Sequence, residues 1–134
     1  DRSSAASDVY KRQAVRYLQH LGMENVEAWE HELGARLVEG VQKIEGVRLL
    51  GPADPSKRAG LVALAIEGVH PHDVGQLLDT QGIAVRVGHH CAQPLHRCAG
   101  VTASTRASTY IYNTTEDVDA FLKALAEVRP YFGF

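Results

Sequence analysis

Residues 61–66 read Leu-Val-Ala-Leu-Ala-Ile, an unbroken apolar run near the middle of this 134-residue chain. A run of this kind predicts a strand buried on both faces. The whole chain is 45% apolar and 22% charged, which is the composition of an ordinary globular protein. Its length fits one small domain, so we take this run as the centre of a single core.

Three further strands and four helices are expected around this run. The expected strands are 47–50, 83–87 and 105–112, and the expected helices are 14–21, 25–44, 71–82 and 114–130. Asn25 is expected to cap the second helix, and Thr114 with Asp117 forms a capping box that begins the last one. Residues 88–102 are expected to form a loop.

These elements predict the α+β class. The expected fold is a small, mostly antiparallel sheet of about four strands with helices packed on one face, because so few strands do not suit a doubly wound sheet. The other face then meets solvent or another domain. Arg86 and Arg106 are expected to point toward that uncovered face.

The first thirteen residues do not resemble the rest. Ser3 to Ser7 is small and polar, and residues 8–13, Asp-Val-Tyr-Lys-Arg-Gln, show no helical or strand period and resemble a translated transposon end used in sequencing libraries. We therefore expect 1–13 to be a sequencing or cloning scar and 14–134 to be the native domain. The alternative is a frayed natural terminus.

Composition also argues against some partners. The formal charge of −2 offers no basic field for nucleic acid. No apolar run approaches the roughly 18 residues that cross a bilayer, and no signal peptide is visible, so we expect no membrane partner and a cytoplasmic location. The two cysteines, Cys91 and Cys98, are then expected to be reduced.

The segment richest in reactive side chains is 86–97, Arg-Val-Gly-His-His-Cys-Ala-Gln-Pro-Leu-His-Arg. It places the Cys91 thiol just past a strand end, with His89, His90 and Arg86 nearby. Neighbouring cations favour the nucleophilic thiolate, and a loop lets the sulfur move. Cys91 is therefore a candidate nucleophile; the alternative is an incidental cysteine.

A metal site or a sulfur-accepting module is a second interpretation of the same segment. His89 with Cys91, and His96 with Cys98, offer four ligands that zinc accepts. The spacing matches no common zinc motif. Cys98 by itself is expected to be a bystander.

Arg106 is the second candidate site residue. It lies within a β-forming run and is flanked by small residues, which is unusual for a strand interior. A guanidinium matches a carboxylate bidentately, so Arg106 is a candidate for binding the α-carboxylate of an amino acid. An ion pair with a surface carboxylate is the alternative.

Residues 86–94 closely resemble the active-site loop of SufS-type (group II) cysteine desulfurases, which are class V aminotransferase-like enzymes of pyridoxal-phosphate fold type I. Residues 105–108 and 112–114 resemble the downstream block of that family. The resemblance extends over nearly all of 14–133. It implies that the chain is the carboxy-terminal small domain of such an enzyme.

The resemblance also implies roles for individual residues. Cys91 corresponds to the cysteine that becomes a persulfide, and Arg106 to the arginine that binds the substrate carboxylate. Arg86, His89 and His90 border the nucleophile without an assigned role. The implied reaction converts L-cysteine to L-alanine. The persulfide sulfur then passes to an acceptor protein of the SufE or SufU type for iron–sulfur cluster assembly, and the full-length enzyme is expected to be a homodimer.

The implied cofactor is pyridoxal 5′-phosphate, whose Schiff-base lysine lies in a large domain that this chain does not contain. The chain has four lysines, none in a suitable setting, at positions 11, 43, 57 and 123. We therefore expect the chain alone to be inactive. A selenocysteine lyase is the alternative within the family, and a non-catalytic interaction domain is an alternative outside it.

Overall fold

The computed structural model describes residues 2–134, with side chains described from residue 6 onward. The elements in chain order are α1 (Arg2–Leu21), α2 (Met23–Gln42), β1 (Val47–Leu50), the 3-10 helix η1 (Pro55–Lys57), β2 (Leu61–Ile66), α3 (Pro71–Thr80), β3 (Arg86–Gly88), α4 (Gln93–Ala99), β4 (Ser104–Ser108) and α5 (Thr115–Tyr131). No described helix is both long enough and apolar enough to cross a membrane.

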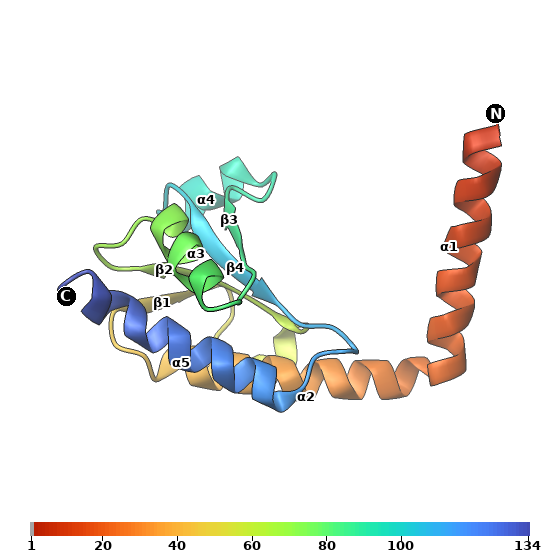
Figure 1. Ribbon diagram of the computed structural model, residues 1–134, viewed down its shortest axis with the longest axis horizontal. Helices are drawn as coiled ribbons and strands as arrows, with labels where there is room; N and C mark the ends of the chain where they lie inside the picture. Colours follow the sequence, from red (N-terminus) through yellow and green to blue (C-terminus); the bar gives the residue numbers. More distant parts are fainter. Residues whose placement is uncertain (1) are drawn as a thin grey trace.

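The four strands form one antiparallel sheet in the order β1-β2-β4-β3. Helices α2 and α5 run side by side along one face of the sheet, and α3 packs beside them (Figure 1). This arrangement confirms the predicted α+β class with a small antiparallel sheet and helices on one face. The short α4 is not expected from the sequence; it lies over one end of the opposite face of the sheet.

The burial of β2 follows from this one-sided covering. Its residues alternate, since successive side chains of a strand point to opposite faces. Val62, Leu64 and Ile66 are buried under the helices, whereas Ala63 and Ala65 on the other face are only half-buried. The prediction of a strand buried on both faces is therefore wrong. An unbroken apolar run hides the alternation when small alanines occupy the open face.

Helices α2 and α5 contribute most of the core. Each buries one apolar stripe, with Leu33, Leu37 and Val41 on α2 and Phe121 and Leu125 on α5. The core is completed by side chains of β2, α3 and β4. The predicted helices 25–44 and 114–130 are thus confirmed, apart from their exact ends.

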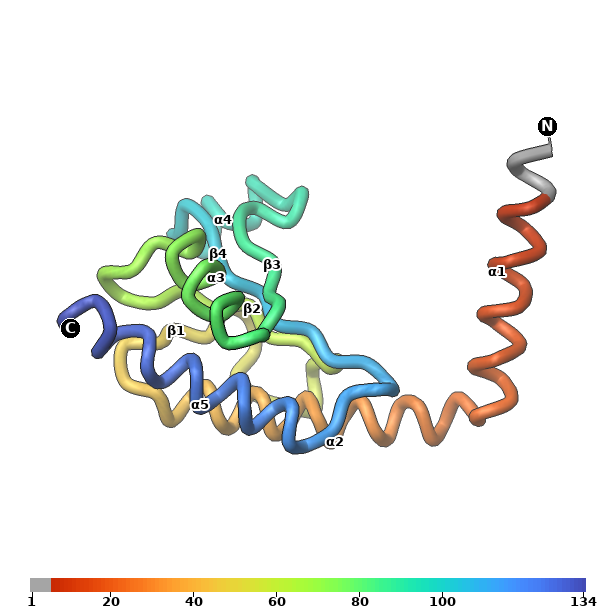
Figure 2. The backbone as a smooth tube through the Cα atoms, in the orientation of Figure 1, coloured from red at the N-terminus to blue at the C-terminus, as the bar shows by residue number. Residues whose placement is uncertain are grey.

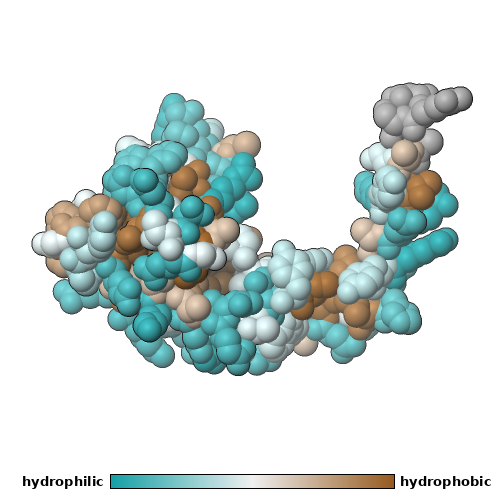
Figure 3. Space-filling model, viewed as in Figure 1, coloured by the Kyte–Doolittle hydropathy of each residue, from teal (hydrophilic) through white to brown (hydrophobic). Residues whose placement is uncertain are grey.

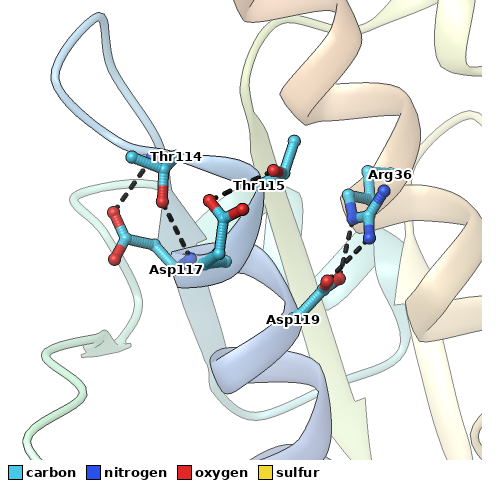
Figure 4. Close-up of polar contacts among 6 residues, drawn as sticks. Arg36, Thr114, Thr115, Asp117 and Asp119 are labelled. Atoms are coloured by element: carbon cyan, nitrogen blue, oxygen red, sulfur yellow. Dashed lines mark hydrogen bonds and ion pairs between the residues drawn. The ribbon is translucent and has the colours of Figure 1, made fainter.

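Polar contacts fix the start of α5 and its position against α2 (Figure 4). The predicted capping box is present: Asp117 N donates to Thr114 Oγ1 at 3.3 Å, and Thr114 N donates to Asp117 Oδ2 at 3.0 Å. Arg36 of α2 donates to both carboxylate oxygens of Asp119, at 2.7 and 2.6 Å. These contacts lie at the surface, so they orient the helix more than they stabilise it.

Several predicted boundaries are wrong for local reasons. Helix α1 begins at Arg2, so residues 2–13 are helical although their sequence shows no helical period. Asn25 does not cap α2, because the helix begins directly after Gly22, whose φ of 85° separates it from α1. The Asn25 side-chain amide donates to Leu21 O at 2.9 Å instead. Strands β3 and β4 are shorter than the predicted 83–87 and 105–112.

The segment 88–102 is not a continuous loop, because α4 occupies its middle. Pro94 lies in the first turn of this helix, where a missing N–H costs nothing. Gly100 ends it in a left-handed conformation, with φ of 69°. On α4 only His96 is buried, so the segment lacks the apolar stripe from which a helix is predicted.

Helix α1 stands away from the rest of the molecule, meeting it only where it joins α2 (Figures 1 and 2). Apolar and aromatic side chains of α1 and the start of α2 lie exposed (Figure 3); they are Val9, Tyr10, Val15, Tyr17, Leu21 and Met23. None of these six belongs to the core.

Candidate functional site

The open face of the sheet carries two arginines. On β4, Thr105 and Ala107 are buried toward the helices, so Arg106 between them points to the opposite face. Arg86 of β3 is the register partner of Arg106 and therefore shares that face. The structure thus brings these two predicted site residues together, on the face where the sequence places them.

A strained turn follows β3. Gly88 has φ of 115°, and the two residues His90 and Cys91 have φ of 52° and 59°. Non-glycine residues in this left-handed region are uncommon, because Cβ then approaches the carbonyl oxygen. A hydrogen bond from Ala92 N to His89 O, at 2.8 Å, closes the turn. The Cys91 side chain is exposed at its tip.

Between α4 and the open face lies a cavity of about 340 Å³. Its lining comes from four segments: the end of β1, β2, the β3–α4 turn with α4, and β4. The lining residues, in that order, are Leu50 and Gly51; Ala63; His90, Ala92, Leu95, His96 and Ala99; and Ser104 and Arg106. Both sequence neighbours of Cys91 line this cavity. The turn that carries the exposed Cys91 therefore borders the cavity, and Arg106 lies in its wall.

Arg106 is half-buried, and its Nε is buried without a hydrogen-bond partner. Within the described residues, no carboxylate pairs with it; the ion pairs found there join His31 to Glu27, Arg36 to Asp119 and Lys57 to Asp54. The alternative of a surface ion pair for Arg106 thus has no partner in this part of the chain. A guanidinium in a cavity wall with free donors is suited to binding an anion.

His90 also lies in the cavity wall. Its Nε2 is 3.1 Å from Ser104 Oγ, and its Nδ1 is buried without a partner. Burial and the positive charge of Arg106 lower the pKa of His90. A hydrogen bond with the Ser104 backbone opposes this effect, and His96 and Arg86 add smaller lowering contributions to the pKa. The imidazole is therefore held in its neutral form near neutral pH.

Two residues of the site escape sequence reasoning. His96 appears there only as a candidate metal ligand, and Ser104 only as a small neighbour of Arg106. In the structure both are buried, at 6% and 1% exposure, and His96 Nε2 lies 2.9 Å from Ser104 Oγ. The four-residue spacing from Ala92 to His96, about one helical turn, is the sequence signal that places this histidine beside the turn.

The alternative metal site is not assembled in the described part of the chain. No three His, Cys, Asp or Glu side chains lie where they share a metal ion. His96 hydrogen-bonds to Ser104 and Ala92 instead, and the ring of His89 meets it edge-on at 5.7 Å. Cys98 is exposed on α4.

Comparisons with known proteins agree with one another. The family model described as "Aminotransferase class-V" matches residues 6–121. A protein named probable cysteine desulfurase from Halalkalibacterium halodurans is 50% identical over 120 residues, covering 90% of this chain and 29% of that protein. Probable cysteine desulfurase 2 of Mycobacterium leprae is 48% identical over the same shares. This chain thus spans about 29% of the length of these curated relatives.

Solved structures give the same result for the fold. An apo structure of a cysteine desulfurase from Thermococcus onnurineus NA1 matches with a TM-score of 0.81 and 40% identity, over 85% of this chain and 28% of that one. The Escherichia coli cysteine desulfurase CsdA, in an S-sulfonic acid form, matches with a TM-score of 0.80 and 34% identity, over 88% of this chain and 29% of that one.

Proposed function

Because the chain belongs to the aminotransferase class-V family, we propose that it is the carboxy-terminal small domain of a pyridoxal-phosphate-dependent cysteine desulfurase. The relatives named above support this activity, and the partial coverage of their length supports the assignment as one domain. In this proposal residues 14–134 form the native domain and 1–13 are foreign, although the family match begins at residue 6.

The observation that carries the proposal is the exposed Cys91 on a strained turn at the rim of a cavity whose wall holds the unpaired Arg106. Backbone strain of this kind persists only where the surrounding structure enforces it, and it concentrates at functional sites. The turn presents a thiol to solvent next to an anion-binding group. That arrangement suits a nucleophile that meets an amino acid.

In the proposed reaction, the Cys91 thiolate attacks the sulfur of L-cysteine. The bond between that sulfur and the substrate Cβ breaks, a sulfur–sulfur bond to Cys91 forms, and the electron pair left on carbon takes up a proton. The products are L-alanine and a persulfide on Cys91. No external oxidant or reductant is needed, because sulfur is oxidised as carbon is reduced.

Arg106 is proposed to bind the α-carboxylate of the substrate. Its planar fork forms two parallel hydrogen bonds to a carboxylate, which fix orientation as well as position. Arg86, the cross-strand partner of Arg106, adds positive charge on the same face. His89 and His90 border Cys91.

The described residues of this chain do not provide a site for pyridoxal phosphate. All four lysines, Lys11, Lys43, Lys57 and Lys123, are exposed, and none lines the cavity with Arg106. When bound, the cofactor withdraws electrons from the substrate Cα and so allows the sulfur to leave. We propose that its lysine belongs to the remainder of the enzyme and that this chain alone is inactive.

Finer features of the proposal follow the same family. They are a SufS-type enzyme acting in the cytoplasm as a homodimer, which passes its persulfide sulfur to an acceptor protein of the SufE or SufU type for iron–sulfur cluster assembly. A selenocysteine lyase is the alternative substrate specificity.

The test compares two cysteine variants in the full-length enzyme that contains this domain. Cys91→Ser is expected to abolish alanine release from L-cysteine, because a hydroxyl does not accept the sulfur. Cys98→Ser, seven residues away and also exposed, is the matched control and is expected to keep full activity. Alanine release at the normal rate by the Cys91→Ser enzyme would refute the proposal.

A further inference from the structure

A chain of hydrogen bonds links His90 to His96 in the wall of the cavity. His96 Nδ1 lies 3.0 Å from Ala92 O, His96 Nε2 lies 2.9 Å from Ser104 Oγ, and His90 Nε2 lies 3.1 Å from the same oxygen. His96 and Ser104 are almost completely buried. No part of the proposed reaction uses them.

The direction of these hydrogen bonds follows from chemistry. A backbone carbonyl oxygen only accepts, so His96 Nδ1 must carry the proton that lies toward Ala92 O. In the neutral form of His96 this leaves a lone pair on Nε2, to which the Ser104 hydroxyl donates. Having donated its only proton, Ser104 Oγ accepts from His90 Nε2–H.

The consequence falls on the other ring nitrogen of His90. With its proton on Nε2, the neutral imidazole has a lone pair on Nδ1, the buried atom that lacks a partner. Burial, the positive charge of Arg106 and, less strongly, that of Arg86 disfavour a second proton on this ring. His90 therefore offers an acceptor in the cavity where Arg106 offers donors.

We propose that His96 and Ser104 are positioning residues that hold His90 in its Nε2–H tautomer, leaving Nδ1 as a hydrogen-bond acceptor beside the Arg106 anion site. The ligand class that fits such a pair carries an anionic group close to a hydrogen-bond donor. Use of this acceptor in sulfur transfer rests on the proposed function, whereas the tautomers themselves do not.

Nitrogen-15 NMR of the imidazole rings in the 134-residue chain tests the proposal directly. Long-range proton–nitrogen correlations distinguish the two tautomers, and His90→Gln and His96→Gln spectra assign the signals. The expected result is opposite tautomers: Nε2–H for His90 and Nδ1–H for His96. Either histidine in the other tautomer would overturn the proposal.

Two variants of His96 test the coupling. His96→Leu removes the acceptor for the Ser104 hydroxyl, which then donates to His90 Nε2, so the Nδ1–H tautomer of His90 is expected to appear. In His96→Gln the side-chain oxygen replaces the acceptor, and His90 is expected to remain Nε2–H. If His90 keeps its tautomer in a folded His96→Leu chain, the positioning role is wrong.

These outcomes are separable from the test of the proposed function. Suppose that His90 keeps its tautomer in His96→Leu and that the Cys91→Ser enzyme releases no alanine. The proposed desulfurase function then stands, and only the positioning role is wrong. The expected tautomers with full activity of that enzyme would do the reverse.

Discussion

His90 and Cys91 occupy backbone conformations that their side chains disfavour, and this strain distinguishes the site from an ordinary loop. Each such residue costs of the order of 1–3 kcal/mol, so the contacts of the turn with α4 and β4 must offset it. The sequence identifies Cys91 and Arg106 as candidates, since a thiol among imidazoles and an arginine in a strand are both unusual. It does not reveal the strain, which depends on where the chain re-enters α4.

Ser104 shows the limit of residue-level prediction. A serine next to a strand arginine carries no distinctive pattern. Its burial arises only because α4 covers that end of the open face, where Arg48 donates to Ala99 O. The links between His90, Ser104 and His96 are tertiary and have no sequence period to reveal them.

The proposed binding of the substrate carboxylate by Arg106 predicts a specific kinetic defect in the full-length enzyme. Arg106→Ala is expected to raise the KM for L-cysteine about 10- to 100-fold, because hydrogen bonds to a charged group contribute about 1.5–3 kcal/mol. Steady-state kinetics measure it. Arg106→Lys, which keeps the charge without the fork, should give a smaller increase, and Arg36→Ala on the far side of α2 should give none. An unchanged KM in Arg106→Ala would show that Arg106 does not bind the substrate carboxylate.

At the scale of elements, regular patterns predict well and short or irregular ones do not. The predictions of α2, α5 and the capping box at Thr114 are confirmed because local spacing determines these features. Strand β4 ends at Ser108, before the predicted 112, because Tyr110 and Asn113 form a turn: Tyr110 N donates to Asn113 Oδ1 at 2.9 Å. Helix α4 is missed because it lacks an apolar stripe.

The capping box makes a prediction about stability. Thr114→Ala is expected to lower the free energy of unfolding by about 1 kcal/mol, the usual cost of losing an N-cap side chain. Thr114→Ser keeps the hydroxyl and should change it little. Chemical denaturation of the 134-residue chain measures both. Equal stability of the alanine variant and the wild type would show that α5 does not depend on this cap.

The acidic partner of the cap predicts a pH dependence. Hydrogen bonds from the Thr114 backbone and the Asn113 side chain lower the pKa of Asp117. A lowered carboxyl pKa contributes stability above the ordinary aspartate pKa of about 3.9, and this contribution disappears as pH falls through the folded-state value. The stability difference between wild type and Asp117→Asn should therefore shrink on acidification. A difference that grew toward low pH would contradict the sign.

At the scale of the whole molecule, helix α1 differs from residues 23–134, which we call the body. The body has a continuous core under one face of the sheet, whereas the described side chains of α1 are exposed except for the half-buried Leu18. Helix α1 therefore lacks the tertiary packing from which most helical stability in proteins comes. The sequence predicts the second half of α1 but not its isolation, because helical periodicity does not report what a helix packs against.

Removal of α1 is therefore expected to leave the body folded. A chain without residues 2–21 should keep the thermal unfolding midpoint of the full 134-residue chain within about 2 °C, since almost no core area is lost. Circular dichroism recorded as the temperature is raised gives the unfolding midpoint of each chain. A shortened chain that fails to unfold cooperatively would show that α1 stabilises the body. Leu37→Ala, which removes a core side chain, is the destabilised control, with an expected loss of about 2–5 kcal/mol.

The central claim is that Cys91 accepts the sulfur. Peptide mass spectrometry of the full-length enzyme after incubation with L-cysteine tests it most directly, provided that free thiols are alkylated before digestion. The account predicts the added mass of one sulfur atom on the peptide bearing Cys91 and none on Cys98. Added sulfur on Cys98 alone, or on no cysteine of this domain while alanine accumulates, would contradict it.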